Sequence, residues 1–287
     1  MLCGCSSASA SGPPSRTPTA VAPTTTTTTP EQPGWTTLST GPRGVAIDER
    51  VFSQPDGVAV TVARFIRGNV SFDLHIGSQE PPTNGATLGP ASGPAVSAAE
   101  QPQLLACFNG GFKANDGVGG VEADGTVLLP LKTGEASLVI DTNGSARIGV
   151  WGSTVPAPGE PVASVRQNLP PLVLGGQPAA DVGTWQDWGY TLGHVPRVPR
   201  SALGEDAQGN LLYAAAGYSL PVDLSGALLS AGAVTAMQLD INPSTLQLDT
   251  AATPGAPLVA RVPGQTRPAD QCQVGWIRDF VTVLSTG

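Results

Sequence analysis

The stretch SLPVDLSGALLSAGAVTAMQLD, residues 219–240, reads as a helix followed directly by a strand. Ser219 is a favourable N-cap residue, Pro221 suits the first helical turn, and Gly232 suits the position after the last one. Leucines between them recur at helical spacing and form an apolar stripe. The pattern predicts a helix over 220–231 that packs on a sheet through this stripe.

The strand after this helix ends in QLDINPS, residues 238–244. Its apolar side chains alternate with Gln238 and Asp240, so Asp240 should point to the face opposite the apolar one. Pro243 favours extended backbone at Asn242 and stiffens this end of the strand. Asp240 is therefore either a turn residue at a strand end or a carboxylate held in a site.

Alternation and turn chemistry predict further strands. In NVSFDLHIG, residues 69–77, the apolar side chains share one face, which places His75 on the polar face. Hairpin turns are expected at Asp124-Gly125, Asn143-Gly144 and Gly209-Asn210, where residues that tolerate positive φ separate apolar runs. We expect an α+β fold, a strand-rich mixed sheet with hairpins and few helices, in a single domain.

The composition of the 287 residues supports this interpretation. The chain is 40% hydrophobic and 13% charged, with 36 Gly and 28 Pro, which favours a loop-rich fold with a substantial core. The formal net charge is −8 and no basic patch is evident, so nucleic acid is not an expected partner. No apolar run is long enough to span a membrane.

The start of the chain predicts an extracytoplasmic location. MLCGC resembles a bacterial lipobox with Cys5 as the acylated residue, although the usual preceding apolar segment is absent. A Thr/Pro-rich tract follows, typical of a disordered or O-glycosylated stalk. We therefore assign 1–34 to a lipid-anchored stalk and 35–287 to the folded domain, in contact with the membrane surface only through the anchor. The alternative is two chance cysteines.

The remaining cysteines, Cys107 and Cys272, either form a disulfide outside the cytosol or stay as buried thiols. No Cys/His spacing fits a zinc site, and no metal or cofactor is expected.

Two more stretches have residues suited to a site. FNGGF, residues 108–112, places Asn109, Gly110 and Gly111 at the end of an apolar run, where glycines permit close approach of the backbone. The stretch RSALG begins with Arg200, whose planar guanidinium suits carboxylate or phosphate. Taken alone, FNGGF is typical of a turn, and Arg200 is typical of an internal salt bridge.

In this order and spacing, FNGGF, RSALG and QLDINPS resemble the phosphodiester glycosidase family, which includes the lysosomal uncovering enzyme. In that family the last motif reads Leu-Asp-Gly-Gly-Gly-Ser. The resemblance implies hydrolysis of a sugar-1-phosphodiester in an envelope or extracellular glycoconjugate, with a carbohydrate or phosphoglycan as ligand. It implies Asp240 as acid/base or electrostatic residue, Arg200 as phosphate clamp and Asn109 as positioning residue.

This chain departs from the pattern where Ile-Asn-Pro replaces the three glycines: the proline removes one backbone N–H suited to an anion, and Ile241 adds a branched side chain. The alternative is therefore a glycan-binding envelope lipoprotein that keeps the cleft without catalysis. Further candidate contacts are Asn242 and Asn168, the latter either lining the cleft or satisfying backbone groups near a Pro-Pro break. Trp185 and Trp188 either stack on sugar or cover the core. Candidates for a second carboxylate are Asp116, Glu122, Asp187 and Glu205.

Overall fold

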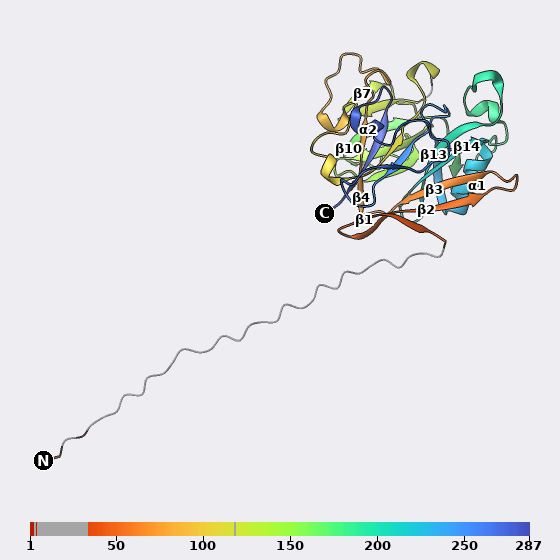
Figure 1. The fold of residues 1–287 in the computed structure, drawn as a ribbon. Coiled ribbons are helices and arrows are strands. Elements are labelled where there is room, and N and C mark those ends of the chain that lie inside the picture. Colours follow the sequence, from red (N-terminus) through yellow and green to blue (C-terminus); the bar gives the residue numbers. More distant parts are fainter. Residues whose placement is uncertain (3, 5–33, 118) are drawn as a thin grey trace.

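The computed structural model describes residues 1–2, 4, 34–117 and 119–287. Within these ranges the strands form three sheets, accompanied by two α-helices and short 3₁₀ turns (Figure 1). The predicted strand-rich α+β single domain is confirmed, although the strands are divided among three antiparallel sheets instead of one mixed sheet. Cys5 and the Thr/Pro-rich tract of the predicted stalk lie outside the described residues.

The largest sheet carries the predicted helix-to-strand unit. Its strands, in spatial order, are β1 (Thr36–Gly41), β2 (Gly44–Ser53), β3 (Ala59–Phe65), β14 (Leu211–Ser219), β13 (Val198–Asp206), β15 (Ala233–Gln238), β11 (Val173–Leu174) and β12 (Gln177–Pro178).

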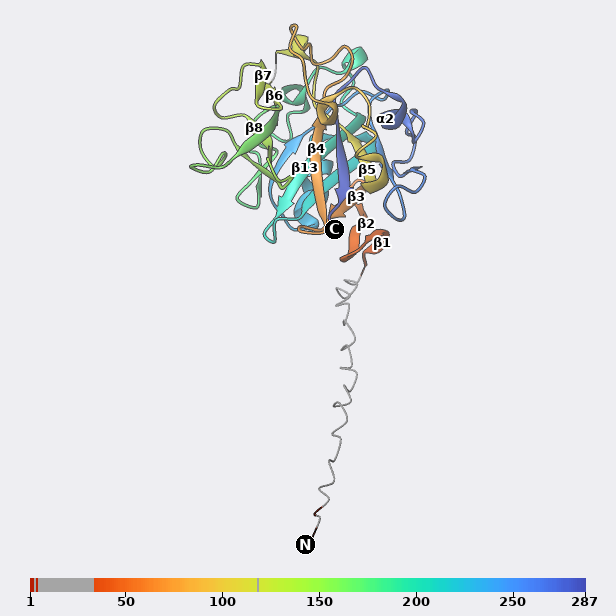
Figure 2. The same cartoon turned by 90° about the vertical axis from the view of Figure 1, so that its left-hand side faces the viewer.

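Two smaller sheets pack beside it. The first contains β7 (Thr126–Leu129), β6 (Val121–Ala123), β10 (Val162–Gln167), β8 (Ala136–Asp141) and β9 (Ala146–Val150). The second contains β17 (Val259–Ala260), β16 (Leu248–Thr250), β5 (Leu104–Asn109), β18 (Phe280–Ser285) and β4 (Val70–His75). The chain end after β18 lies beside the β1–β2 turn, where Arg43 Nε donates to the Gly287 carbonyl over 2.8 Å (Figure 2).

The helices are short. They are α1 (Pro221–Ser230) and α2 (Gln271–Val274), and the 3₁₀ turns are Pro90–Ser92, Gln101–Gln103, Ala114–Asp116, Trp185–Trp188 and Leu192–His194. Helix α1 follows the predicted range to within a residue at each end, and Gly232 ends it with φ +98°. The predicted N-cap is wrong: Leu220 occupies that position, and its N–H donates to Asp223 Oδ2 over 2.7 Å.

The large sheet is buried on both faces, which explains the continuous apolar run in β14. Leu212 and Ala214 face α1, in a core shared with Leu228. Leu211 and Tyr213 face the two smaller sheets, in the main core. Because successive side chains of a strand point to opposite faces, one strand contributes to both cores.

All three predicted hairpins are present. In the tightest one, Ala123 pairs with Thr126, and Asp124 and Gly125 have φ values of +49° and +67°. Positive φ at both central positions is the type I′ geometry that matches the twist of paired strands.

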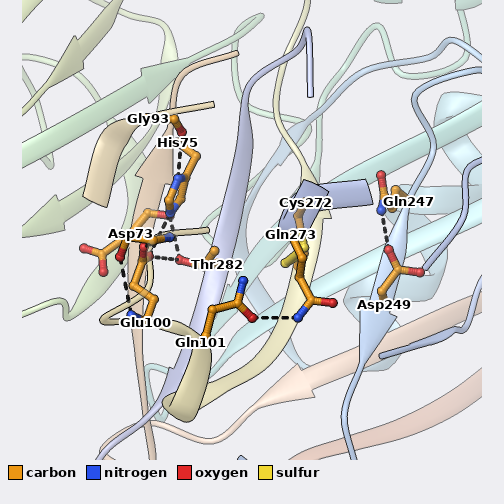
Figure 3. The surroundings of a disulfide bond; sticks show 12 residues. Asp73, His75, Gly93, Glu100, Gln101, Gln247, Asp249, Cys272, Gln273 and Thr282 are labelled. Carbon is orange, nitrogen blue, oxygen red and sulfur yellow. Dashed lines mark hydrogen bonds and ion pairs between the residues drawn. A yellow bond between two sulfur atoms is a disulfide. The ribbon is translucent and has the colours of Figure 1, made fainter. Parts of the chain in front are cut away.

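His75 lies on the face of β4 opposite the apolar Phe72, Leu74 and Ile76, as alternation predicts, but this face is covered at His75. The side chain is 0% exposed, because the segment around Gly93 and Glu100 covers that side of β4 (Figure 3). Its Nδ1 lies 2.8 Å from the Gly93 carbonyl oxygen, and its Nε2 lies 2.8 Å from Glu100 Oε1. The imidazole therefore links β4 to this segment within the interior.

A disulfide joins Cys107 of β5 to Cys272 of α2, with 6.6 Å between their Cα atoms (Figure 3). It closes 165 residues of chain, so it restricts the unfolded state strongly. The bridge connects the strand that leads into FNGGF with the segment that precedes β18.

Candidate functional site

Ends of strands from two sheets meet at one place. Asp240, just after β15, donates its N–H to the Gly110 carbonyl over 3.2 Å, and Gly110 donates to the Asp279 carbonyl over 3.0 Å. Ser201 of β13 donates its N–H to the Asp240 carbonyl over 3.2 Å. These bonds join the large sheet to the sheet that contains β5 and β18.

A cavity of about 410 Å³ opens at this junction. Its walls come from the segments after β5 and β15, the start of β13, the loop before β13, and Arg278 shortly before β18. Its charged lining residues are Lys113, Asp116, Asp240 and Arg278. A concave site with a few convergent charged groups in a largely apolar wall is typical of small-ligand sites.

Asp240 is a buried carboxylate at this cavity. Its Oδ1 accepts the Ile241 N–H over 2.7 Å, and its Oδ2 lies 3.0 Å from Arg278 Nη2 as an ion pair without hydrogen-bond alignment. Burial raises the pKa of Asp240, and the positive charge of Arg278 opposes that rise. The predicted carboxylate therefore lies in a pocket, next to a cation.

Arg278 is the functional candidate that sequence reasoning missed. Its Nη2 donates to the Gly111 carbonyl over 2.8 Å, whereas its buried Nε has no hydrogen-bond partner among the described residues. A signal was present in the segment WIRDFVTV, where a charged pair stands directly before an apolar strand. Arg278 thus stands next to the start of the apolar strand β18, just as Asp240 stands next to the end of the apolar strand β15.

A second ion pair lies beneath the cavity. Arg166 Nε donates to Asp279 Oδ2 over 2.7 Å, and the remaining guanidinium nitrogens donate to the carbonyls of Gln167 and Phe112 over 2.7 and 2.6 Å. Both side chains are almost fully buried. This pair fixes Asp279, and with it the backbone from which Arg278 reaches the cavity.

The two glycines of FNGGF make room for this pair. A Cβ on Gly110 would lie 1.9 Å from Asp279 Oδ2, and one on Gly111 would lie 2.8 Å from Arg166 Cζ. The Gly111 N–H donates to Asp279 Oδ2 over 3.1 Å. Close approach explains both glycines, but what approaches is the ion pair of this chain, and neither glycine lines the cavity.

Asn109 is also internal. Its Nδ2 donates to Ser201 Oγ over 2.9 Å, and its Oδ1 accepts from Tyr213 Oη over 2.7 Å and from the Gln247 N–H over 3.2 Å. The side chain is buried in bonds that link β5, β13 and β14, and it is absent from the cavity wall. The structure therefore places Asn109, predicted as a positioning residue for substrate, among bonds that join the sheets.

Arg200, predicted as a phosphate clamp, likewise lies outside the cavity wall. The side chain is 0% exposed, and its Nη1 donates to the Trp188 carbonyl over 3.0 Å and to Gln238 Oε1 over 3.2 Å. Burial lowers its pKa to about 10. Within the described ranges no carboxylate forms an ion pair with it, so the internal salt bridge is not observed either.

Of the other predicted contacts, Asn242 lines the cavity and Asn168 does not. The Asn242 Oδ1 accepts from the Ser244 N–H and hydroxyl over 2.9 and 2.8 Å, which closes the turn after β15. Asn168 is buried; its Nδ2 donates to the Gln238 carbonyl over 2.6 Å, and its Oδ1 accepts the Phe112 N–H over 3.3 Å. It satisfies backbone groups at the end of β15 and at Phe112, and not those around the Pro-Pro break to which the sequence pointed.

Among the four candidate second carboxylates, Asp116 alone appears in the described cavity wall. Trp188 is buried in the core and donates its indole N–H to the Asp181 carbonyl over 3.2 Å. In the described part of the chain no cluster of His, Cys, Asp or Glu is suited to a metal ion, and no helix there has the length and apolar character needed to cross a membrane.

The fold is similar to that of two solved structures. One is the zebrafish N-acetylglucosamine-1-phosphodiester alpha-N-acetylglucosaminidase catalytic domain, auto-inhibited by its pro-peptide, with 15% identity, a TM-score of 0.54 and 88% of each chain covered. The other is a hypothetical protein from Synechocystis, with 14% identity, a TM-score of 0.51, and 85% of this chain and 63% of that chain covered. No family model and no curated protein sequence matches. At these identities the likeness shows a distant relationship of fold.

Proposed function

We propose that the cavity around Asp240 and Arg278 hydrolyses the glycosidic bond of a sugar-1-phosphodiester. Water would attack the anomeric carbon, the bond from that carbon to the phosphate oxygen would break, and the electron pair would leave with the phosphate. A proton from the water is released, and the products are a free sugar and a phosphomonoester. The ion pair of Asp240 and Arg278 at the cavity, 3.0 Å between Oδ2 and Nη2, carries the proposal.

The residue types at the cavity suit this chemistry. A phosphate leaving group needs stabilisation of its negative charge, which Arg278 and the exposed Lys113 supply. The anomeric carbon gains positive charge in the transition state, which the Asp240 carboxylate stabilises, and Asp116 is the second carboxylate. The fold likeness to an enzyme whose name specifies such a bond supports the same substrate class.

The test is turnover of α-linked sugar 1-(methyl phosphate) diesters of glucose, galactose and N-acetylglucosamine, followed by ³¹P NMR of the methyl phosphate released. We expect hydrolysis of at least one diester and a loss of about 100-fold or more in kcat for Asp240→Asn. The matched control is Asp187→Asn, an exposed carboxylate outside the cavity wall, which should retain the wild-type rate. Wild-type turnover by Asp240→Asn would remove that carboxylate from the mechanism.

The second candidate function is glycan binding without catalysis. Both Asp240 oxygens are already engaged, one by the Ile241 N–H and one by Arg278, and the Ile-Asn-Pro segment forms part of the wall. Saturable binding of the diesters with no methyl phosphate released after prolonged incubation favours this candidate over the hydrolase.

We further propose that the protein acts outside the cytoplasm, anchored to the membrane by a lipid on Cys5. The Cys107–Cys272 disulfide supports an oxidising compartment. Mass spectrometry of the chain expressed in a bacterial host behind a lipoprotein signal peptide should find a diacylglyceryl group on Cys5. An unmodified cysteine there contradicts the anchor.

A further inference from the structure

An exposed aromatic side chain stands at the mouth of the cavity. Tyr190 lines the cavity, and 70% of the residue is exposed to solvent. It lies in the loop between Trp188 and Pro196, which leads into β13. In a chain with 5% aromatic residues, an exposed ring beside charged cavity residues requires an explanation.

The two ends of this loop are held by the buried guanidinium of Arg200. Its Nη1 donates to the Trp188 carbonyl over 3.0 Å, and its Nη2 donates to the Pro196 carbonyl over 3.4 Å. The buried Gln238 strengthens the first end, because its Nε2 donates to the same Trp188 carbonyl over 2.8 Å. Arg200, placed by the sequence at a substrate, thus fixes the base of the loop that carries Tyr190.

The loop itself is also constrained. Gly189 has φ +99°, and a Cβ there would lie 2.7 Å from Phe112 Cζ, so the backbone before Tyr190 packs directly on the cavity wall. Farther along, Thr191 Oγ1 donates to the Val195 carbonyl over 2.7 Å. The rings of Tyr190 and His194 lie 4.9 Å apart at 85°, with 3.5 Å between Tyr190 Oη and His194 Nε2.

We propose that Tyr190 is the platform of a sugar-binding subsite at the mouth of the cavity, and that Arg200 is its positioning residue. A pyranose ring presents C–H groups on its faces and hydroxyl groups at its edge. The aromatic face of Tyr190 takes the C–H groups, while the hydroxyl groups meet water and polar cavity residues. This inference rests on the proposed function for the identity of the ligand, and it assigns the sugar to the Tyr190 side of the cavity and the phosphate to Arg278.

The test compares Tyr190→Ala and Tyr190→Phe with Tyr218→Ala, a matched control whose tyrosine is 66% exposed and lies outside this cavity. Binding of methyl α-glycosides and of the sugar 1-(methyl phosphate) diesters is measured by saturation-transfer NMR and calorimetry. We expect Tyr190→Ala to raise Kd on the order of tenfold, and Tyr190→Phe and Tyr218→Ala to change it less than twofold. Wild-type affinity in Tyr190→Ala overturns the proposal, as does the absence of binding of every sugar.

The role of Arg200 is tested separately. Because Arg200 is proposed to act by positioning Tyr190, its substitution should matter only when Tyr190 is present. Arg200→Lys is expected to raise Kd for the glycosides severalfold in the wild-type background and to cause no further rise in the Tyr190→Ala background. Equal effects in both backgrounds would show that Arg200 does not act through the platform.

The experiments distinguish failure of the proposed hydrolase activity from failure of the proposed sugar subsite. Glycoside binding that depends on Tyr190, in a protein that releases no methyl phosphate, keeps the subsite and rejects the hydrolase. Hydrolysis with an unchanged KM in Tyr190→Ala keeps the hydrolase and rejects the subsite.

Discussion

The polar interior beneath the cavity and the cavity wall itself use similar residue types for different purposes. In the interior, Asn109 and Arg200 are surrounded by fixed protein partners and join strands or loops. At the wall, Arg278 keeps a buried Nε with no hydrogen-bond partner in the described chain, and Lys113 is exposed. A polar residue beside a glycine-rich strand end can therefore contact a ligand directly, or it can hold in place the backbone of residues that do.

The largest effect is expected from removing the buried cation of the polar interior. Arg166→Met leaves Asp279 as a buried carboxylate without its cation and removes two bonds to backbone carbonyls. We expect the free energy of unfolding to fall by about 3–5 kcal/mol, measured by urea denaturation with the disulfide intact.

The control for that variant is Arg147→Met, which breaks the partly exposed pair with Glu160 and should cost about 1 kcal/mol or less. If Arg166→Met does not accumulate as folded protein, adding Asp279→Asn removes the unpaired charge and should recover part of the loss. Equal, small losses in Arg166→Met and Arg147→Met would contradict a supporting role for the buried pair.

The sequence was sufficient to predict the elements and the faces of their side chains, and insufficient to predict which side chains distant segments would cover. Turn residues such as Asp124-Gly125 and the helix boundary at Gly232 act locally, so their predictions were confirmed. Burial of His75 and Arg200 depends on segments distant in sequence that cover them, which no local pattern records. Asp240 was found because its strand fixes its direction; Arg278 was missed because its partners, Asp240 and the Gly111 carbonyl, belong to segments distant in sequence.

A smaller effect concerns pH and the interior near Asn109. Gln247, whose N–H donates to Asn109, also donates its Nε2 to the buried carboxyl of Asp249, and Gln265 Nε2 donates to the other oxygen over 2.7 Å. Burial raises the pKa of Asp249 to about 6, from about 4 in an unfolded chain. Since the folded state holds this proton more tightly, the stability it contributes is present below about pH 4 and is lost as pH rises through 6.

Asp249→Asn should therefore flatten the dependence of unfolding free energy on pH between about 4 and 6. The unfolding free energy that the variant loses relative to wild type should be smaller at pH 7.5 than at pH 4, by on the order of 1–2 kcal/mol. Denaturant melts across pH measure this. Asp73, whose pKa burial also raises to about 6, remains in the variant, so part of the slope persists. An unchanged slope would show that Asp249 titrates alike in both states.

We propose that Arg278, and not Arg200, contacts the phosphate. Calorimetry tests this through the ratio of affinities for a sugar 1-phosphate and the corresponding methyl glycoside, measured in Arg278→Lys and Arg200→Lys. Because lysine keeps the charge and loses the planar fork, we predict that Arg278→Lys lowers this ratio by about tenfold. Arg200→Lys should keep the wild-type ratio while lowering the free energy of unfolding by about 1–3 kcal/mol. The reverse pattern, with the ratio lost in Arg200→Lys and retained in Arg278→Lys, would contradict the account.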